Sequence, residues 1–359
     1  MIKTSIDGIS VAGMAAAVSN EWISLKSLME ANGQGDIADK FIKKTGVTGR
    51  YNAGIKQTTS DFCFVAAKRI IEEKKIDANE IGILVFVTQT PDYGIPATAC
   101  VLQKRLGLST DCIAFDVNLG CSGFTYGINI VASLMKNSSA KYALLLCGDT
   151  SAKERLADEK TKSSNSANYL FGDSGTATLL EKDENADIIQ MISKTDGTGY
   201  QAIISPYFGW KNPTSDIQKG GATFMDDVAV LQFAINEVPQ LICDTMNLTN
   251  AKPEDYVGLV LHQANLFIMK TVTKRAGFTN DQMLVSIDKF ANTSSSSIPI
   301  SIVKDYGESS SEDKIRLMCC GFGVGLSWST VDMYIRPSDV LPLIHTDEYF
   351  EDDLSSFES

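Results

Sequence analysis

Short, continuous apolar runs separated by segments with helical spacing constrain the fold of this chain most strongly. The clearest run is Ile83–Thr88, in which apolar, mostly β-branched residues follow one another without polar alternation. Such a run is typical of a strand buried on both faces, as in a parallel sheet covered by helices. Similar runs recur at 142–147, 257–261 and 315–320, with helical patterns between them. The sequence therefore predicts an α/β fold with mostly parallel central sheets.

This alternation occurs twice along the 359 residues, and an acidic, polar segment at 181–187 separates the two occurrences. We therefore predict two halves, one spanning residues 1–181 and the other residues 182–346. Residues 347–359 form an acidic tail with few apolar side chains to bury. We expect this tail to be mobile or only weakly docked.

Composition excludes several classes of function. A net charge of −12 and a pI near 4.7 argue against binding to nucleic acid or to an anionic membrane surface. No apolar window is long enough to span a bilayer, and the first residues lack a secretion signal. Eight scattered cysteines without a Cys-x-x-Cys pair indicate reduced thiols, so we expect a cytoplasmic protein. With only two histidines, we expect no metal site.

Cys121 is the first candidate for a catalytic residue. It lies between the apolar run 112–115, which reads as a strand, and a segment from Ser122 to Leu134 with helical spacing. A thiol at a helix N-terminus is favoured as thiolate by the helix dipole and the free N–H groups. Most cysteines are nevertheless structural, and Cys121 by itself supports both interpretations equally.

Three segments of the second half carry polar or flexible residues at the ends of predicted strands or helices. His262 directly follows the run 257–261, although a lone histidine is more often a core residue than a catalyst. Asn292 precedes a run of serines whose simplest role is to cap the helix that begins near Pro299. Gly321–Gly325 reads by itself as a glycine-rich turn. None of these segments is decisive alone.

Taken in order, these motifs resemble those of the β-ketoacyl-acyl-carrier-protein synthase III family, whose members have the thiolase fold. The resemblance rests on Asp116–Phe124, His262–Asn265, Asn292–Ser296 and Gly321–Leu326, and on further landmarks at 45–47, 96–100 and 171–175. It covers nearly the whole chain up to Ile335. It implies a thiolase-like α/β fold with two duplicated halves and αβαβα layering.

The resemblance also implies a Cys-His-Asn site. Cys121 would accept an acyl group from coenzyme A, and His262 and Asn292 would stabilise the enolate formed when a malonyl extender loses carbon dioxide. The backbone N–H groups of Cys121 and Val324 would form a second oxyanion hole, next to Gly323. Phe322 would give the malonyl carboxylate an apolar surround. Coenzyme A and carrier phosphopantetheine thioesters would be substrates, with no permanently bound cofactor, and the chain would be a homodimer.

Several positions depart from the family pattern. Phe41 lies near the position of a tryptophan that stacks on the adenine of coenzyme A, and the loop 161–168 lacks the arginine expected there. Phe267 replaces an arginine linked to docking of the acyl carrier protein, which leaves Lys270, Lys274 and Arg275 for that role. Ile95 falls where the family places a residue that reaches across the dimer. The acyl donor could therefore be a coenzyme A or a carrier thioester.

Three alternatives stay open on the sequence. An acyltransferase on the same scaffold would pass the acyl group to an alcohol or amine without decarboxylation. A catalytically silent partner subunit is disfavoured, because all three polar residues are present. A hydroxymethylglutaryl synthase would need a carboxylic acid beside the thiol, and only Asp92 is available near the appropriate segment.

Overall fold

A computed structural model describes residues 1–152, 169–206, 211 and 223–352. Two mixed sheets dominate the fold, and two pairs of short strands accompany them. The loop at 161–168, which lacks the expected arginine, lies outside the described residues. Within the described ranges, no helix is long and apolar enough to cross a membrane.

The first sheet has six strands and contains the apolar run at 83–88. In spatial order they are β15 (Ile344–His345), β2 (Ile9–Val18), β8 (Ser174–Lys182), β7 (Tyr142–Asp149), β5 (Ile81–Val87) and β6 (Ile113–Val117). Strands β7, β5 and β6 are parallel, as the continuous apolar runs predict. Strand β8 is antiparallel to both of its neighbours, β2 and β7.

The second sheet has five strands. In spatial order they are β1 (Ile2–Ile6), β9 (Ile189–Thr195), β14 (Ser327–Ile335), β13 (Ile315–Gly323) and β12 (Gly258–Leu261). Only β12 and β13 pair in parallel. The expectation of mostly parallel strands is therefore wrong for this sheet: β13 and β14 form an antiparallel hairpin with a short connection, and β9 runs antiparallel to both β1 and β14.

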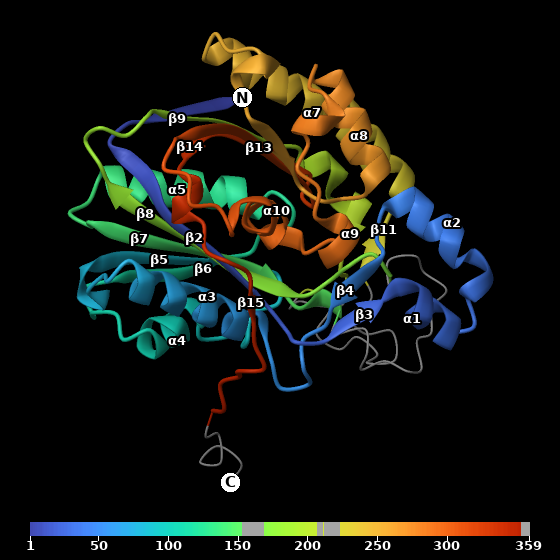
Figure 1. Cartoon of the computed structure of the whole chain (residues 1–359), viewed down its shortest axis with the longest axis horizontal. Helices are drawn as coiled ribbons and strands as arrows, with labels where there is room; N and C mark the ends of the chain where they lie inside the picture. Colours follow the sequence, from blue (N-terminus) through green and yellow to red (C-terminus); the bar gives the residue numbers. More distant parts are fainter. Residues whose placement is uncertain (153–168, 207–210, 212–222, 353–359) are drawn as a thin grey trace.

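Helices form three layers around the two sheets, which confirms the αβαβα order (Figure 1). The central layer is α5 (Gly123–Lys136) and α10 (Ser297–Tyr306). One outer layer is α3 (Thr59–Glu73) and α4 (Thr98–Arg105). The other is α7 (Asp227–Leu248) and α8 (Leu266–Arg275).

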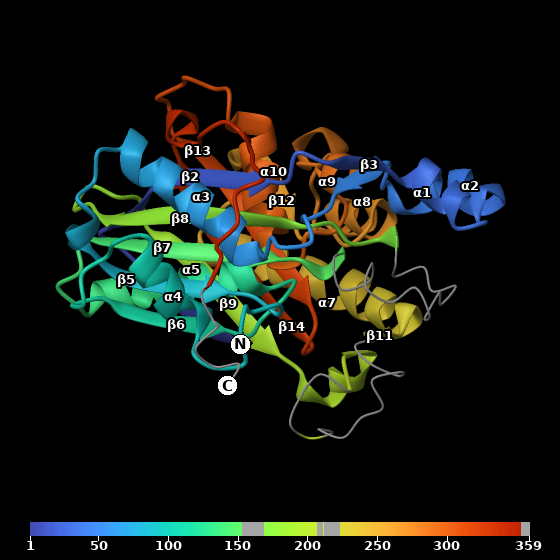
Figure 2. The same ribbon diagram turned by 90° about the horizontal axis from the view of Figure 1, so that it is seen from below.

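The remaining elements lie near one end of the molecule (Figure 2). They are β3 (Trp22–Ser24), α1 (Leu25–Ala31), α2 (Gly35–Thr45), β4 (Gly49–Tyr51), α9 (Ile287–Phe290) and the strand pair β10 (Ile203–Ile204) and β11 (Phe224–Met225).

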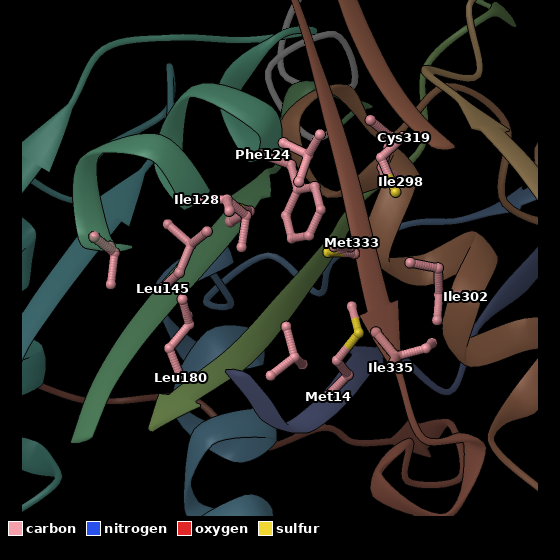
Figure 3. Close-up of a cluster of buried hydrophobic side chains, with 14 of the residues drawn as sticks. Met14, Phe124, Ile128, Leu145, Leu180, Ile298, Ile302, Cys319, Met333 and Ile335 are labelled. Carbon is pink, nitrogen blue, oxygen red and sulfur yellow. The ribbon is translucent and has the colours of Figure 1, made fainter. Parts of the chain in front are cut away.

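The central helices are apolar because both of their sides face a sheet. Phe124 and Ile128 of α5 pack against Leu145 and Leu180 of the first sheet, and Met333 of the second sheet lies in the same cluster (Figure 3). Complete burial of such side chains contributes roughly 1.5–3 kcal/mol each. This shared core fixes the two sheets relative to each other, and with them the strand ends that carry the polar motifs.

The predicted boundary at residue 181 is close to the end of β8 at Lys182. The first and last strands of the chain, however, each pair with a strand of the other half. Strand β1 pairs with β9 in the second sheet, and β15 pairs with β2 in the first. Each half therefore receives a strand from the opposite end of the chain. The division into halves stays a prediction.

Residues 347–352, the described part of the acidic tail, dock on the first half, and the strength of this docking stays a prediction. The Gln57 side chain donates hydrogen bonds to the carbonyls of Thr346 and Glu348 at 3.0 and 3.1 Å. The Phe350 N–H donates to Asp61, and the Phe350 ring lies 4.6 Å from the Arg105 guanidinium. Side chains of the segment contribute as well, since Lys56 forms an ion pair with Glu351 at 2.8 Å and lies over the Tyr349 ring.

Phe350→Ala should lower the free energy of unfolding by about 1–2 kcal/mol. The substitution removes a cation–π contact from Arg105, which forms a buried ion pair with Asp61 at 2.9 Å. Urea unfolding monitored by fluorescence measures the effect. Ile55→Ala is the matched control, because that apolar side chain is 91% exposed. Equal urea midpoints for Phe350→Ala and the wild type would show that the Phe350 contact of the docked tail contributes nothing to the free energy of unfolding.

Candidate active site

The three polar residues singled out in the sequence line one cavity of about 390 Å³. Cys121 lies between β6 and α5, His262 directly follows β12, and Asn292 follows α9. Val324, Gly323, Phe322 and Phe41 line the same cavity. Five segments far apart in the sequence therefore meet, because β6 and β12 belong to sheets that pack on the same central helices.

The Cys121 sulfur faces two backbone donors. The N–H groups of Val324 and of Cys121 itself both form hydrogen bonds toward the sulfur. The turn that presents Val324 is held by Ser327, whose hydroxyl donates to the Val324 carbonyl at 2.7 Å and lies 2.6 Å from Ser122 Oγ. Two backbone N–H groups at one point are the arrangement that stabilises an oxyanion.

His262 is a buried, neutral imidazole. Its Nδ1 lies 2.8 Å from Ser297 Oγ, and its ring meets Phe322 edge-on with 5.6 Å between ring centroids. Burial lowers the pKa of His262 to about 3, and a backbone hydrogen bond with Ser294 opposes that shift only partly. The ring is therefore uncharged near pH 7. Ser297, expected as a possible helix cap, instead contacts this ring.

Asn292 is oriented by the backbone around it. Its Oδ1 accepts the Ser294 N–H at 2.9 Å, which leaves the side-chain NH₂ to act as a donor. Its own N–H donates to the Leu170 carbonyl at 2.9 Å. Ala291 and Ser294 both have positive φ values, 58° and 54°, which non-glycine residues rarely adopt. Such backbone strain is concentrated at functional sites.

Sequence comparison places the chain in a family. Two family profiles match, 3-oxoacyl-[acyl-carrier-protein] synthase III over residues 115–197 and its C-terminal region over residues 246–334. β-Ketoacyl-[acyl-carrier-protein] synthase III of Baumannia cicadellinicola is 30% identical over 296 residues, which is 82% of this chain and 90% of that protein. The chain belongs to the β-ketoacyl-acyl-carrier-protein synthase III family.

Solved structures agree with this assignment. The 3-oxoacyl-(acyl-carrier protein) synthase of Burkholderia xenovorans superposes with a TM-score of 0.88 at 30% identity, covering 96% of this chain and 99% of that one. The synthase III of Pseudomonas aeruginosa superposes with a TM-score of 0.80 at 25% identity, covering 94% and 100%. The thiolase-like fold expected from the motifs is confirmed.

Three of the other residues predicted for a synthase III site lie on an exposed helix. Lys270, Lys274 and Arg275 are on α8, whose start at Phe267 and Ile268 lines the cavity. Arg275 donates to the Ile235 carbonyl at 2.6 Å and to Asn236 at 3.2 Å, so its guanidinium is partly engaged by α7. Their role in carrier docking stays a prediction.

Ile95 and Asp92 lie outside the cavity of their own chain. The Ile95 side chain is 90% exposed, so its expected contribution to a pocket would have to be made to a second copy. Asp92 accepts a hydrogen bond from Ser60 Oγ at 2.7 Å and does not line the cavity. It therefore does not supply the carboxylic acid that hydroxymethylglutaryl synthase chemistry needs.

Two supporting residues were missed by sequence reasoning. Asp149, at the end of β7, is 1% exposed and accepts hydrogen bonds from the Gln89 N–H at 2.7 Å and the Ser295 hydroxyl at 3.4 Å. It thereby ties the end of β5 to the segment that follows Asn292. Gln263 accepts from the N–H groups of Ser286 and Ile287 at 2.9 and 3.1 Å, which fastens α9 to the strand end at His262. The sequence signal for Asp149 was its position at a strand end, and Gln263 lies within the motif His262–Asn265, which does not reveal its hydrogen bonds.

The expectation that the helix N-terminus favours a Cys121 thiolate is wrong for the chain without substrate. Burial raises the pKa of the Cys121 thiol to about 11, and the hydrogen bond from the Val324 N–H lowers it only in part. Desolvation of a charged sulfur in a largely apolar cavity outweighs the helix dipole. The resting thiol is therefore protonated near pH 7.

Alkylation of Cys121 by iodoacetamide should accordingly be slow at pH 7 and rise about tenfold per pH unit towards pH 11. At pH 8 only roughly a thousandth of a thiol with that pKa is thiolate. Peptide mass spectrometry measures the rate, with the exposed Cys100 in the same sample as the internal reference. A Cys121 rate that is already flat between pH 6 and 8 would contradict the raised pKa.

Proposed function

We propose that this chain is a decarboxylating condensing enzyme of the synthase III type. The observation that carries the proposal is the convergence of Cys121, His262 and Asn292 on one cavity, next to the backbone N–H of Val324. A carbon–carbon bond between two thioesters needs a nucleophile, a site for each oxyanion and shielding from water, and this cavity offers all of them.

In the first step Cys121 attacks an acyl thioester of coenzyme A or of an acyl carrier. The bond from Cys121 Sγ to the acyl carbon forms, the donor C–S bond breaks, and the Cys121 proton leaves with the released thiol. The developing oxyanion on the acyl carbon would receive hydrogen bonds from the backbone N–H groups of Cys121 and Val324, which lie next to the sulfur. These donors are already in position, which lowers the barrier.

In the second step a malonyl group on the acyl carrier loses carbon dioxide. The enolate oxygen receives hydrogen bonds from Nε2 of neutral His262 and from the Asn292 NH₂. Ser297 supports the role of His262, because a Ser297 hydroxyl that donates to Nδ1 leaves the proton on Nε2. Ser294 supports the role of Asn292, because its N–H binds Oδ1 and leaves the NH₂ group as a donor. Phe322 lies against His262 and gives the carboxylate an apolar environment. The enolate carbon then attacks the acyl carbon of the Cys121 thioester, and the bond from that carbon to Cys121 Sγ breaks. The released thiolate takes up a proton from water, and the product is a 3-oxoacyl carrier.

The partners follow from the same proposal. An acyl carrier protein would approach the cavity mouth beside α8, near Lys270, Lys274 and Arg275, and Phe41 would contact the coenzyme A donor. The chain would act as a homodimer. Strand β6 supports this, since it is the last strand of its sheet and its Ile113 is 48% exposed.

The test is incubation with a panel of acyl-coenzyme A donors, followed by malonyl carrier protein labelled in the free carboxyl group. We expect an acyl adduct on Cys121 by intact mass, then labelled carbon dioxide and a 3-oxoacyl carrier. Cys121→Ala should give no adduct. An adduct that reaches an alcohol or amine without carbon dioxide release would favour the acyltransferase alternative, and no adduct with any donor would favour a silent subunit.

A further inference from the structure

A polar side chain stands beside the nucleophile in a cavity wall that is otherwise mostly apolar. Gln89 follows β5, and this strand pairs in parallel with β6, which leads to Cys121. Gln89 lines the cavity together with Cys121 and Val324. None of the roles described above requires a carboxamide at this position.

The Gln89 amide is placed against the turn that precedes Cys121. A Cβ atom built on Gly120 would collide with Gln89 Oε1 and would lie 3.1 Å from Val324 Cγ1. Gln89 and Val324 therefore both close on Gly120, the residue before the nucleophile. A side chain at position 120 would have to displace the end of the flexible Gln89 side chain.

The backbone of Gln89 is fixed while its amide is free. The Gln89 N–H donates to buried Asp149 at 2.7 Å. Within the described part of the chain, the side-chain amide makes no hydrogen bond to protein. A primary amide offers two N–H donors and a carbonyl acceptor. A primary amide that has no protein partner among the described residues and lies in a largely apolar wall is suited to a polar group of a ligand.

We propose that Gln89 forms a polar subsite for the acyl group, so that the preferred acyl donor carries a hydroxyl or carbonyl oxygen on its chain. This inference rests on the proposed acylation of Cys121. Gln89 takes part in no bond that forms or breaks, and it acts as a specificity residue. A site that hydrogen-bonds a substrate oxygen discriminates strongly against the analogue that lacks it, because the site's own polar group is then left unpaired.

The experiment compares two donors that differ by one hydroxyl, 3-hydroxybutyryl-coenzyme A and butyryl-coenzyme A. The rate of adduct formation on Cys121 is followed by intact mass for the wild type and for Gln89→Leu, an apolar side chain of similar size. We expect the wild type to prefer the hydroxy donor by about tenfold or more. Gln89→Leu should remove or reverse this preference by slowing the hydroxy donor and accelerating the butyryl donor.

Two further variants keep the test decisive. Gln89→Thr retains a shorter polar group and should give an intermediate preference, even if the leucine variant folds poorly. Val324→Ala changes the other side of Gly120 without changing polarity, and should shift both donors in the same direction. Thermal unfolding of each variant checks its fold.

Equal wild-type rates for the two donors, or a parallel loss of both in Gln89→Leu, would overturn the polar subsite. A parallel loss would indicate that Gln89 contacts the part of the acyl donor that is the same in both compounds. If neither donor nor acetyl-coenzyme A forms any adduct on Cys121, the proposed function fails and the subsite fails with it.

Discussion

His262→Ala and Asn292→Ala should each reduce carbon dioxide release from malonyl carrier by about 10²–10³-fold, while acylation of Cys121 changes by less than about threefold. Both side chains are assigned to the enolate oxygen, whereas the acyl oxyanion is held by backbone N–H groups. The expected factor is that of losing one preorganised donor from an oxyanion site.

The two steps are measured separately. Acylation is followed by the intact mass of the enzyme in a single turnover, and decarboxylation by release of labelled carbon dioxide from the acylated enzyme. His345→Ala is the matched control for the histidine, because His345 lies in β15 outside the cavity and should leave both rates unchanged. An equal loss of acylation and decarboxylation in the His262 and Asn292 variants would refute this division of labour.

Gly323→Ala should lower the acylation rate at least about 100-fold in a protein that still folds. A Cβ atom at this position would lie 2.6 Å from both Cβ and Sγ of Cys121, far inside van der Waals contact. The methyl group must displace the nucleophile from the Cys121 and Val324 N–H groups. A misplacement of about 1 Å at a reacting atom costs on the order of 10²-fold in rate.

Gly94→Ala is the matched control for that substitution. A Cβ atom on Gly94 would have no neighbour within 4 Å, so acylation should match the wild type. Thermal unfolding of both variants separates a displaced sulfur from a damaged fold. Wild-type acylation by Gly323→Ala would mean that the turn from Gly321 to Gly325 does not define the position of the thiol.

Cys121, His262 and Asn292 could be singled out from the sequence because each residue is tied to a local pattern, and the structure brings all three to one cavity. Their catalytic roles stay a prediction. Cys121, His262 and Asn292 each lie beside a strand end or a glycine- or serine-rich turn. Such positions can be recognised from the local sequence. Their neighbours were less visible. Asp149 and Gln263 act through hydrogen bonds to segments 146 and 24 residues away, and nothing in their own flanking sequence records those partners.

The acidic tail also shows that contacts between distant segments cannot be predicted from local sequence. Its composition predicts a mobile or weakly docked segment. Backbone groups of residues 346–350 nevertheless form hydrogen bonds with Gln57 and Asp61, and the tail sequence contains no information about these partners. The prediction of parallel strands was wrong in the second sheet for a related reason. An apolar run indicates burial on both faces, whereas the direction of its neighbour depends on the connection between the two strands.

The sequence by itself determined the layered α/β architecture and the family, and it singled out the three polar residues that meet in the cavity, because apolar periodicity and short motifs are local properties of the chain. Only the tertiary structure decided the electrostatics and the shape of the site. Burial raises the Cys121 pKa and lowers that of His262, and the end of β5 brings the Gln89 amide beside the nucleophile. Desolvation and contact depend on what surrounds a group in space, which no stretch of sequence contains.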